Sequence, residues 1–160
     1  MSVAIRWEPA VRGLLPTAWR ARLAREVARM AKAAARLDGR ADYAVGLTLT
    51  TDAAIHELNR HYRGKDKPTD VLAFAQREGP GAGVAPDELG DIVISVPTAK
   101  QQAKRRGPAG LFAELRHLAA HGLCHTLGYD HRTDTEEATM NARAAALVAE
   151  GTRRGRIAPA

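Results

Sequence analysis

Cysteine, aromatic residues and long apolar runs are all scarce in this sequence of 160 residues. Its single cysteine, Cys124, has no partner for an internal disulfide, so the fold does not depend on an oxidising compartment. No apolar stretch approaches the roughly 20 residues of a membrane-spanning helix, and the first residues lack the apolar core of a secretory signal peptide. We therefore expect a cytoplasmic protein with no membrane partner.

Phe, Trp and Tyr make up only 4% of the residues, whereas alanine is abundant. This composition favours closely packed helices over a sandwich of sheets filled with aromatic rings. A length of 160 residues with 45% hydrophobic content is enough for one ordinary core, but not comfortably for two. We expect a single domain over residues 1–160, with a flexible polar tail at 151–160.

Basic residues outnumber acidic ones, with 24 Lys and Arg against 18 Asp and Glu, which gives a net charge of +6. A positive field of this kind attracts a polyanion such as nucleic acid. Many basic soluble proteins nevertheless bind no nucleic acid. Charge alone therefore leaves both kinds of protein open.

Hydrophobic periodicity changes between strand and helix spacing along the chain. Glycine, proline and capping residues mark where each element begins or ends. Strands are expected at 3–7, 44–49, 71–76 and 89–96, helices at 19–37, 52–62, 97–106, 110–127 and after Thr133, and an exposed Gly- and Pro-rich connection at 78–88. This order predicts an α+β fold in which a four-stranded mixed sheet packs with about five helices around a central helix at 110–127.

Three histidines in the last third of the chain have the spacing of a metal-ligand set. His121 and His125 are four residues apart on the helix expected at 110–127, so they project from one face. Gly128 permits the turn that brings His131 back to the same ion. Three imidazoles suit Zn²⁺ best, with other divalent transition metals as alternatives, and leave one position for a water whose pKa falls to about 7. This arrangement predicts a metal-dependent hydrolase in which the three rings converge on one ion.

The same histidine spacing occurs in metzincin proteases, which place a glutamate directly after the first histidine. Here that position is Gly122. Peptide hydrolysis loses its usual general base without this carboxylate, whereas phosphodiester cleavage depends on it less. A zinc metallopeptidase is therefore the weaker alternative.

Three segments resemble one known family. The motif HGLCHTLGYDH at 121–131 resembles the H-G-x-L-H-L-x-G-Y-D-H signature of the YbeY endoribonucleases, which are bacterial ribosomal RNA maturation factors. NRHYRGKDKPTDVLAF at 59–74 resembles the N-x-x-Y-R-x-x-D-x-P-T-D-V-L-S-F block of that family, and ELGDIVIS at 88–95 resembles its L-G-D-I strand. Together these segments extend over about half of the chain in the expected order.

The resemblance implies a single-strand-specific, zinc-dependent endoribonuclease that acts on the 3′ end of the small-subunit ribosomal RNA and in ribosome quality control. It places the metal ligands at His121, His125 and His131, and a catalytic arginine at Arg63, whose fork of donors suits a phosphate oxygen. The implied partners are single-stranded RNA and the small ribosomal subunit. A ribosome-associated RNA-binding factor with a purely structural metal is a second alternative.

Four further residues are candidates for supporting roles. His117 lies one helical turn before His121, where it would either orient a ligand or face the substrate, or else be an ordinary core histidine. Asp130 would orient a ligand or cap a turn. Lys65 and Lys67, beside Arg63, are expected to contact RNA phosphates.

Two positions depart from the family signature, because Cys124 and Thr126 replace its two leucines. They lie one residue on either side of His125 on the helix, so both should face the core rather than the metal. For Thr69 and Asp70, at the entry to the strand expected at 71–76, we prefer a capping role over a catalytic one.

Overall fold

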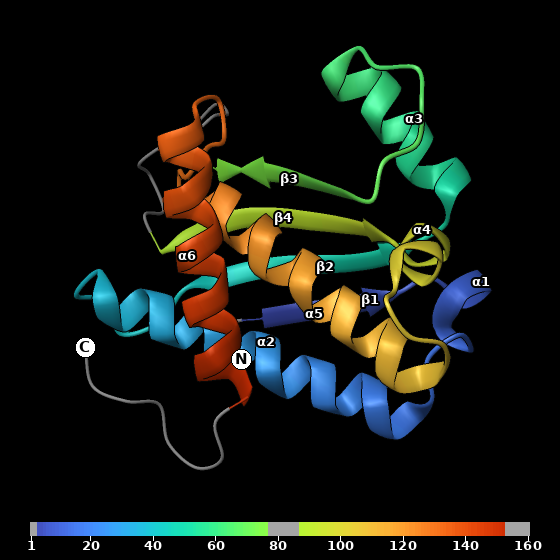
Figure 1. Ribbon diagram of the computed structural model, residues 1–160, viewed down its shortest axis with the longest axis horizontal. Helices are drawn as coiled ribbons and strands as arrows, with labels where there is room; N and C mark the ends of the chain where they lie inside the picture. Colours follow the sequence, from blue (N-terminus) through green and yellow to red (C-terminus); the bar gives the residue numbers. More distant parts are fainter. Residues whose placement is uncertain (1–2, 77–86, 153–160) are drawn as a thin grey trace.

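The computed structural model describes residues 3–76 and 87–152 (Figure 1). The predicted α+β fold is confirmed: over these residues four strands and six helices form one domain. In chain order the elements are β1 (Val3–Trp7), α1 (Pro9–Arg12), α2 (Thr17–Leu37), β2 (Ala44–Thr50), α3 (Asp52–Arg63), β3 (Val71–Ala75), β4 (Glu88–Ser95), α4 (Val96–Gln102), α5 (Gly107–Thr126) and α6 (Asp134–Thr152).

The four strands form a mixed sheet in the order β1-β2-β4-β3. β1 pairs with β2 and β2 with β4 in parallel, whereas β3 runs antiparallel to β4. β2 and β4 are therefore the central strands, and β3, from the middle of the chain, is an edge strand. This order could not be read from the sequence, because periodicity shows which face of a strand is buried but not which strand lies beside it.

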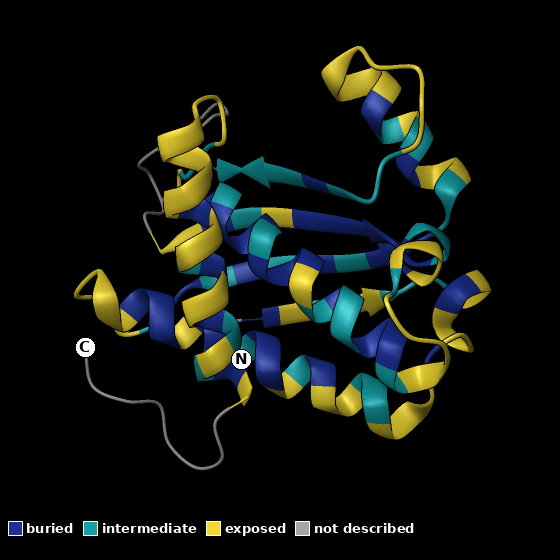
Figure 2. Cartoon of the chain, viewed as in Figure 1, coloured by how far each residue is buried: buried dark blue, intermediate teal, exposed yellow. Residues whose placement is uncertain are grey.

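One face of the sheet is covered by α2 and α5, α6 packs across these two helices, and the main core lies between the sheet and the helices (Figure 1). Alternate residues of the central strands, such as Leu47 of β2 and Ile92 and Ile94 of β4, point into this core. Figure 2 shows the buried residues concentrated along β2, β4 and the inner sides of α2 and α5, whereas much of α6 is exposed.

The opposite face has a smaller apolar cluster under α3. Ile55 of α3 packs on Leu72 of β3 and Val93 of β4, with Phe74 at its margin. α3 therefore covers the β3 and β4 side of the sheet and brings its C-terminal end to the exposed edge.

α5 crosses the sheet at close range because a glycine faces β4. Gly122 is buried, and a Cβ atom added to it would lie 2.6 Å from Cγ2 of Ile92. Real Cβ atoms do not approach other atoms so closely, so any larger residue would push the helix away from the sheet. Gly122 thus has a packing role at the position where metzincin proteases carry their glutamate.

Several predicted boundaries differ from the structure. The four-residue α1 was not predicted, because one helical turn between Trp7 and Pro16 leaves no periodic pattern. α4 ends at Gln102 rather than at residue 106, since Ala103 has an extended backbone. α5 begins at Gly107 rather than at residue 110, with Pro108 in its first turn.

The predicted tail and connection lie largely outside the described residues. Gly151 and Thr152, assigned to the tail, belong to α6, and Gly151 is buried against the backbone of Glu26. Residues 153–160, and the connection at 78–88 as far as residue 86, are beyond the described ranges. No helix within the described ranges is long and apolar enough to span a membrane.

We predict that Gly122→Ala destabilises the protein by about 1–3 kcal/mol, because its methyl group overpacks the contact with Ile92. Urea unfolding measures the effect. Gly13→Ala is the matched control, since a Cβ there meets no atom within 4 Å. In the Ile92→Ala background, Gly122→Ala should cost less than in the wild type. An unchanged unfolding midpoint for Gly122→Ala would contradict the close contact.

Candidate active site

A cleft of about 710 Å³ opens along the edge strand β3. One wall comes from the end of α3 and the loop at 64–70, and the other from the end of α5 and the residues that follow it. The lining residues are Asn59, Arg63, Lys65, Lys67, Thr69, Asp70, Val71, Leu72, Ala73, His125, Gly128, Tyr129, Asp130, His131 and Arg132. Four cationic side chains against two carboxylates give the cleft a positive character before its histidines are counted.

The first wall is held in place by side chains of α3. Asn59, which is buried, donates from Nδ2 to the carbonyl oxygen of Lys67 at 2.9 Å and accepts at its own carbonyl from the backbone of Lys65 at 3.2 Å. Gly64 ends the helix with a φ of 68°, a left-handed conformation that starts the turn. The loop is therefore tied to the helix although the side chains of residues 65–68 are exposed.

Sequence reasoning missed the role of Asn59. Asn59 is the first residue of the segment 59–74 that resembles the YbeY family, and its place in that motif could have indicated a specific role. An asparagine on the inner side of an amphipathic helix also indicates a buried hydrogen bond, because a buried amide without a partner is costly.

Arg63 lies at the outer edge of β3. Its Nη2 donates to the carbonyl oxygen of Ala73 at 2.5 Å, and its guanidinium carbon lies 5.2 Å from the centre of the Phe74 ring. These contacts place a planar cation at the margin of the cleft. The structure thus brings Arg63 together with Lys65 and Lys67 on one wall, as the predicted roles require.

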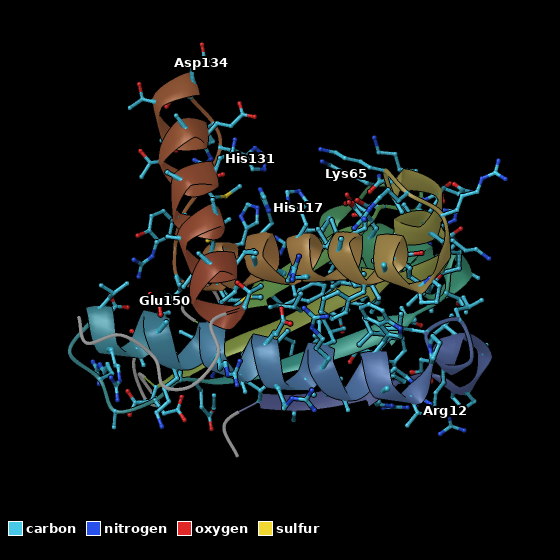
Figure 3. The ribbon with its side chains drawn as sticks, turned by 60° about the horizontal axis from the view of Figure 1, so that its bottom comes forward. Arg12, Lys65, His117, His131, Asp134 and Glu150 are labelled. Atoms are coloured by element: carbon cyan, nitrogen blue, oxygen red, sulfur yellow. The ribbon has the colours of Figure 1, made fainter. Side chains whose placement is uncertain are left out.

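The second wall carries two of the three predicted metal ligands. The ring centres of His125 and His131 are 5.2 Å apart, with the rings nearly perpendicular. Gly128, at a φ of 101°, turns the chain after α5 so that His131 returns toward the helix. Figure 3 shows His131 and Lys65 on opposite sides of the opening above α5.

His121 does not line the cleft that His125 and His131 share. Its Nε2 lies 3.1 Å from Oδ1 of Asn141 on α6, and its Nδ1 lies 3.1 Å from the carbonyl oxygen of His117. Within residues 3–76 and 87–152, no three His, Cys, Asp or Glu side chains are arranged to hold a metal ion. Of the three rings, those of His125 and His131 lie side by side, and the ligand roles of all three histidines stay predictions.

His117 packs against His121, with ring centres 4.2 Å apart. Burial lowers the pKa of His117, and the neighbouring His121 lowers it further. The same two causes, burial first and then His131, lower the pKa of His125. Both imidazoles are therefore biased toward the neutral form, which is the form that binds a metal.

Asp130 caps the turn that precedes His131. Its Oδ1 accepts from the backbone N–H of His131 at 2.7 Å, and its Oδ2 pairs with Nε of Arg132 at 2.9 Å. The backbone hydrogen bond is the main reason why the pKa of Asp130 lies below its usual range. The structure thus shows the turn cap, and a role of Asp130 in orienting a ligand stays a prediction.

Asp70 has the capping role that we preferred, and it also reaches the cleft. Its Oδ1 accepts from the backbone N–H of Val71 at 2.7 Å, and its backbone carbonyl accepts from the backbone N–H of Ser95 at 2.9 Å. Nearby, burial and then the charge of Asp70 raise the pKa of Glu114. Asp70 thus lines the cleft with the carboxylate of Glu114 nearby, although Glu114 itself does not belong to the cleft lining. The sequence did not reveal this proximity.

Cys124 and Thr126 face the core, as their positions beside His125 predicted. Neither has measurable exposure, and the Thr126 hydroxyl donates to the carbonyl of Leu123 at 2.7 Å. Burial raises the pKa of the Cys124 thiol to about 11. Cys124 is therefore a packing residue and does not line the cleft.

These features define a small α+β protein whose positively charged, histidine-bearing cleft suits an anionic substrate. The profile of the family "Endoribonuclease YbeY" matches residues 16–151, and the chain belongs to this family. The resemblance found in the sequence motifs is thereby confirmed, and with it the prediction of an endoribonuclease.

Individual relatives agree with this assignment. The chain is 52% identical over 128 residues to "Endoribonuclease YbeY" of Moorella thermoacetica, a match that covers 76% of this chain and 81% of that protein. It is 47% identical over 137 residues to the protein of the same description from Synechococcus sp., with 84% and 80% covered. The solution structure of TM1509 from Thermotoga maritima has the same fold, with a TM-score of 0.59 at 24% identity over 93% of this chain and 88% of that one.

We predict that Cys124 does not react with Ellman's reagent at pH 8 while the protein is folded, because its pKa of about 11 keeps the buried thiol protonated. One thiol per chain should become reactive after unfolding in guanidinium chloride. Absorbance of the released thiolate measures both states. Rapid stoichiometric reaction of the folded protein would mean that Cys124 is accessible.

Proposed function

We propose that this protein is a single-strand-specific, metal-dependent endoribonuclease in the cytoplasm that matures the 3′ end of small-subunit ribosomal RNA and takes part in ribosome quality control. The observation that carries this proposal is the cleft itself, in which Arg63, Lys65 and Lys67 face His125 and His131. Cationic and imidazole side chains on opposite walls are suited to a phosphodiester, which needs its charge neutralised while a nucleophile is activated.

We infer that His121, His125 and His131 hold a divalent ion, with Zn²⁺ the best fit to three imidazoles. The donor chemistry supports this inference, because the rings of His125 and His131 lie edge to face with their centres 5.2 Å apart and His125 is biased toward its neutral form. His121 is one helical turn before His125, so it would have to leave Asn141 to complete the set. A bound ion would supply Lewis-acid activation of water and part of the charge neutralisation.

Arg63 is proposed to bind the scissile or an adjacent phosphate. The carbonyl of Ala73 and the ring of Phe74 orient the guanidinium before substrate arrives, so little conformational entropy is lost on binding. Lys65 and Lys67 add charge on the same wall, and their contribution should fade with added salt.

A metallopeptidase is less compatible with this site. Gly122 faces Ile92 in the core, so the position that carries the glutamate in metzincins has no room for a carboxylate. None of the cleft-lining residues is a glutamate. The conventional general base of peptide hydrolysis is therefore absent from the described cleft.

We predict about one divalent metal ion per wild-type chain, and its loss from His125→Ala and His131→Ala, since each substitution removes an imidazole from the proposed set. Elemental analysis after exhaustive dialysis measures the content. His61→Ala is the control, because this exposed histidine belongs to α3 and lies outside the cleft lining. Full metal retention by both cleft variants would contradict the ligand assignment.

We predict that Arg63→Ala lowers kcat/KM for cleavage of single-stranded RNA by about 10²- to 10³-fold, because a phosphate charge loses an oriented partner. Arg63→Lys should recover only part of the rate, since ammonium lacks the planar fork. Arg12→Ala, which removes one exposed charge on α1 far from the cleft, should cleave at the wild-type rate (Figure 3).

The same assay separates the alternatives. Duplex RNA and casein, incubated in parallel, should remain intact. Cleavage of casein would favour the metallopeptidase, and salt-sensitive binding of ribosomal particles without any cleavage would favour an RNA-binding factor. Unchanged RNA cleavage by Arg63→Ala would refute the role of that residue.

A further inference from the structure

Tyr62 is an exposed aromatic residue in a chain that has few of them. Its side chain is 62% exposed, whereas Tyr43 and Phe112 are buried and Trp7 and Trp19 pack against the main core. A single exposed apolar residue needs no explanation by itself. Tyr62 differs from such a residue because neighbouring aromatic rings hold its ring in place and because it lies next to Arg63 of the cleft.

The Tyr62 ring is held on two sides. Its centre lies 4.6 Å from that of the His61 ring and 5.4 Å from that of the Phe74 ring, both in edge-to-face geometry. Contacts of this kind favour one ring orientation. The ring is thus preoriented although most of its surface is open to solvent.

Phe74 links this ring to Arg63. The Arg63 guanidinium lies over the Phe74 ring at 5.2 Å, while Tyr62 contacts the same ring at 5.4 Å. Arg63 also lines the cleft, so one phenylalanine at the edge of β3 supports both a cleft cation and an exposed aromatic ring. Two groups with complementary affinities, for a phosphate and for a planar base, therefore lie side by side.

The edge strand places the two groups on a path out of the cleft. Ala73 and Phe74 are consecutive residues of β3, so their side chains point to opposite faces of the sheet. Ala73 lines the cleft, and Phe74 belongs to the cluster under α3. Arg63 contacts both residues at the edge, so a strand leaving the cleft over this edge would pass Arg63 and then reach Tyr62.

We propose that Tyr62 forms a stacking subsite for an unpaired nucleobase next to the phosphate that Arg63 binds. This inference rests on the proposed function and deepens it. A base in a duplex is already stacked on both sides, whereas an unpaired base offers a free face to an aromatic ring. The subsite gives a physical basis for single-strand preference, and it tolerates all four bases because each has a π-face.

Binding of a fluorescein-labelled single-stranded RNA, measured by anisotropy in EDTA to prevent cleavage, tests the subsite. Tyr62→Leu removes the ring but keeps an apolar side chain, and its Kd should rise roughly 5- to 150-fold. Tyr62→Phe keeps the ring and should bind as the wild type does. Leu37→Ala, at a 51% exposed residue on the last turn of α2, is the control and should also leave the Kd unchanged.

Abasic substitution identifies the base that stacks. In RNAs carrying one abasic site at successive positions, one position should weaken wild-type binding by the same factor as Tyr62→Leu. That RNA should bind Tyr62→Leu no more weakly than intact RNA does, because the two changes remove one contact. Additive losses at every position would overturn the proposal.

Two further results separate the possible failures. If Tyr62→Leu binds and cleaves RNA as the wild type does, or if Tyr62→Phe loses as much affinity as Tyr62→Leu, the stacking subsite is wrong while the endoribonuclease proposal stands. If the wild type neither binds nor cleaves RNA, the proposed function itself fails. Urea unfolding of each variant establishes that a change in Kd does not reflect unfolded protein.

Discussion

The close contact between Gly122 of α5 and Ile92 of β4 is the constraint on which the site depends. It sets the depth at which the central helix packs on the sheet. His117, His121 and His125 lie on this helix, and His131 follows within a few residues of its end. Any change in the distance between α5 and the sheet would therefore move these four histidines relative to the edge strand β3.

The cleft is assembled from two distant parts of the chain. Residues 59–73 provide the cationic wall, and residues 125–132 provide the imidazole wall. The antiparallel pairing of β3 with β4 joins them, because β4 also packs beneath α5. The cleft therefore has positively charged side chains on one wall and imidazole side chains on the other.

Local patterns predicted much of this arrangement. The periodicity of α2 and β2 predicted correctly that the first is a helix and the second a strand, with approximate bounds. The spacing of His125, Gly128 and His131 predicted a turn that the structure contains. Strand order was not predictable, because it depends on which strands meet in space. The contact of His121 with Asn141 was missed for the same reason, since the partner lies on another helix 20 residues away.

The loop at 64–70 owes its shape to Asn59 and to the pairing of His56 with Asp66 at 2.7 Å, and residues 64–68 are exposed. Its outward side chains contribute little to the free energy of folding, because they bury little apolar surface. Residues such as Lys65 can therefore be substituted with little loss of stability as long as Asn59 and the pair of His56 and Asp66 are kept. The charge along this side of the cleft can thus change on one short exposed segment without a change in the fold that carries it.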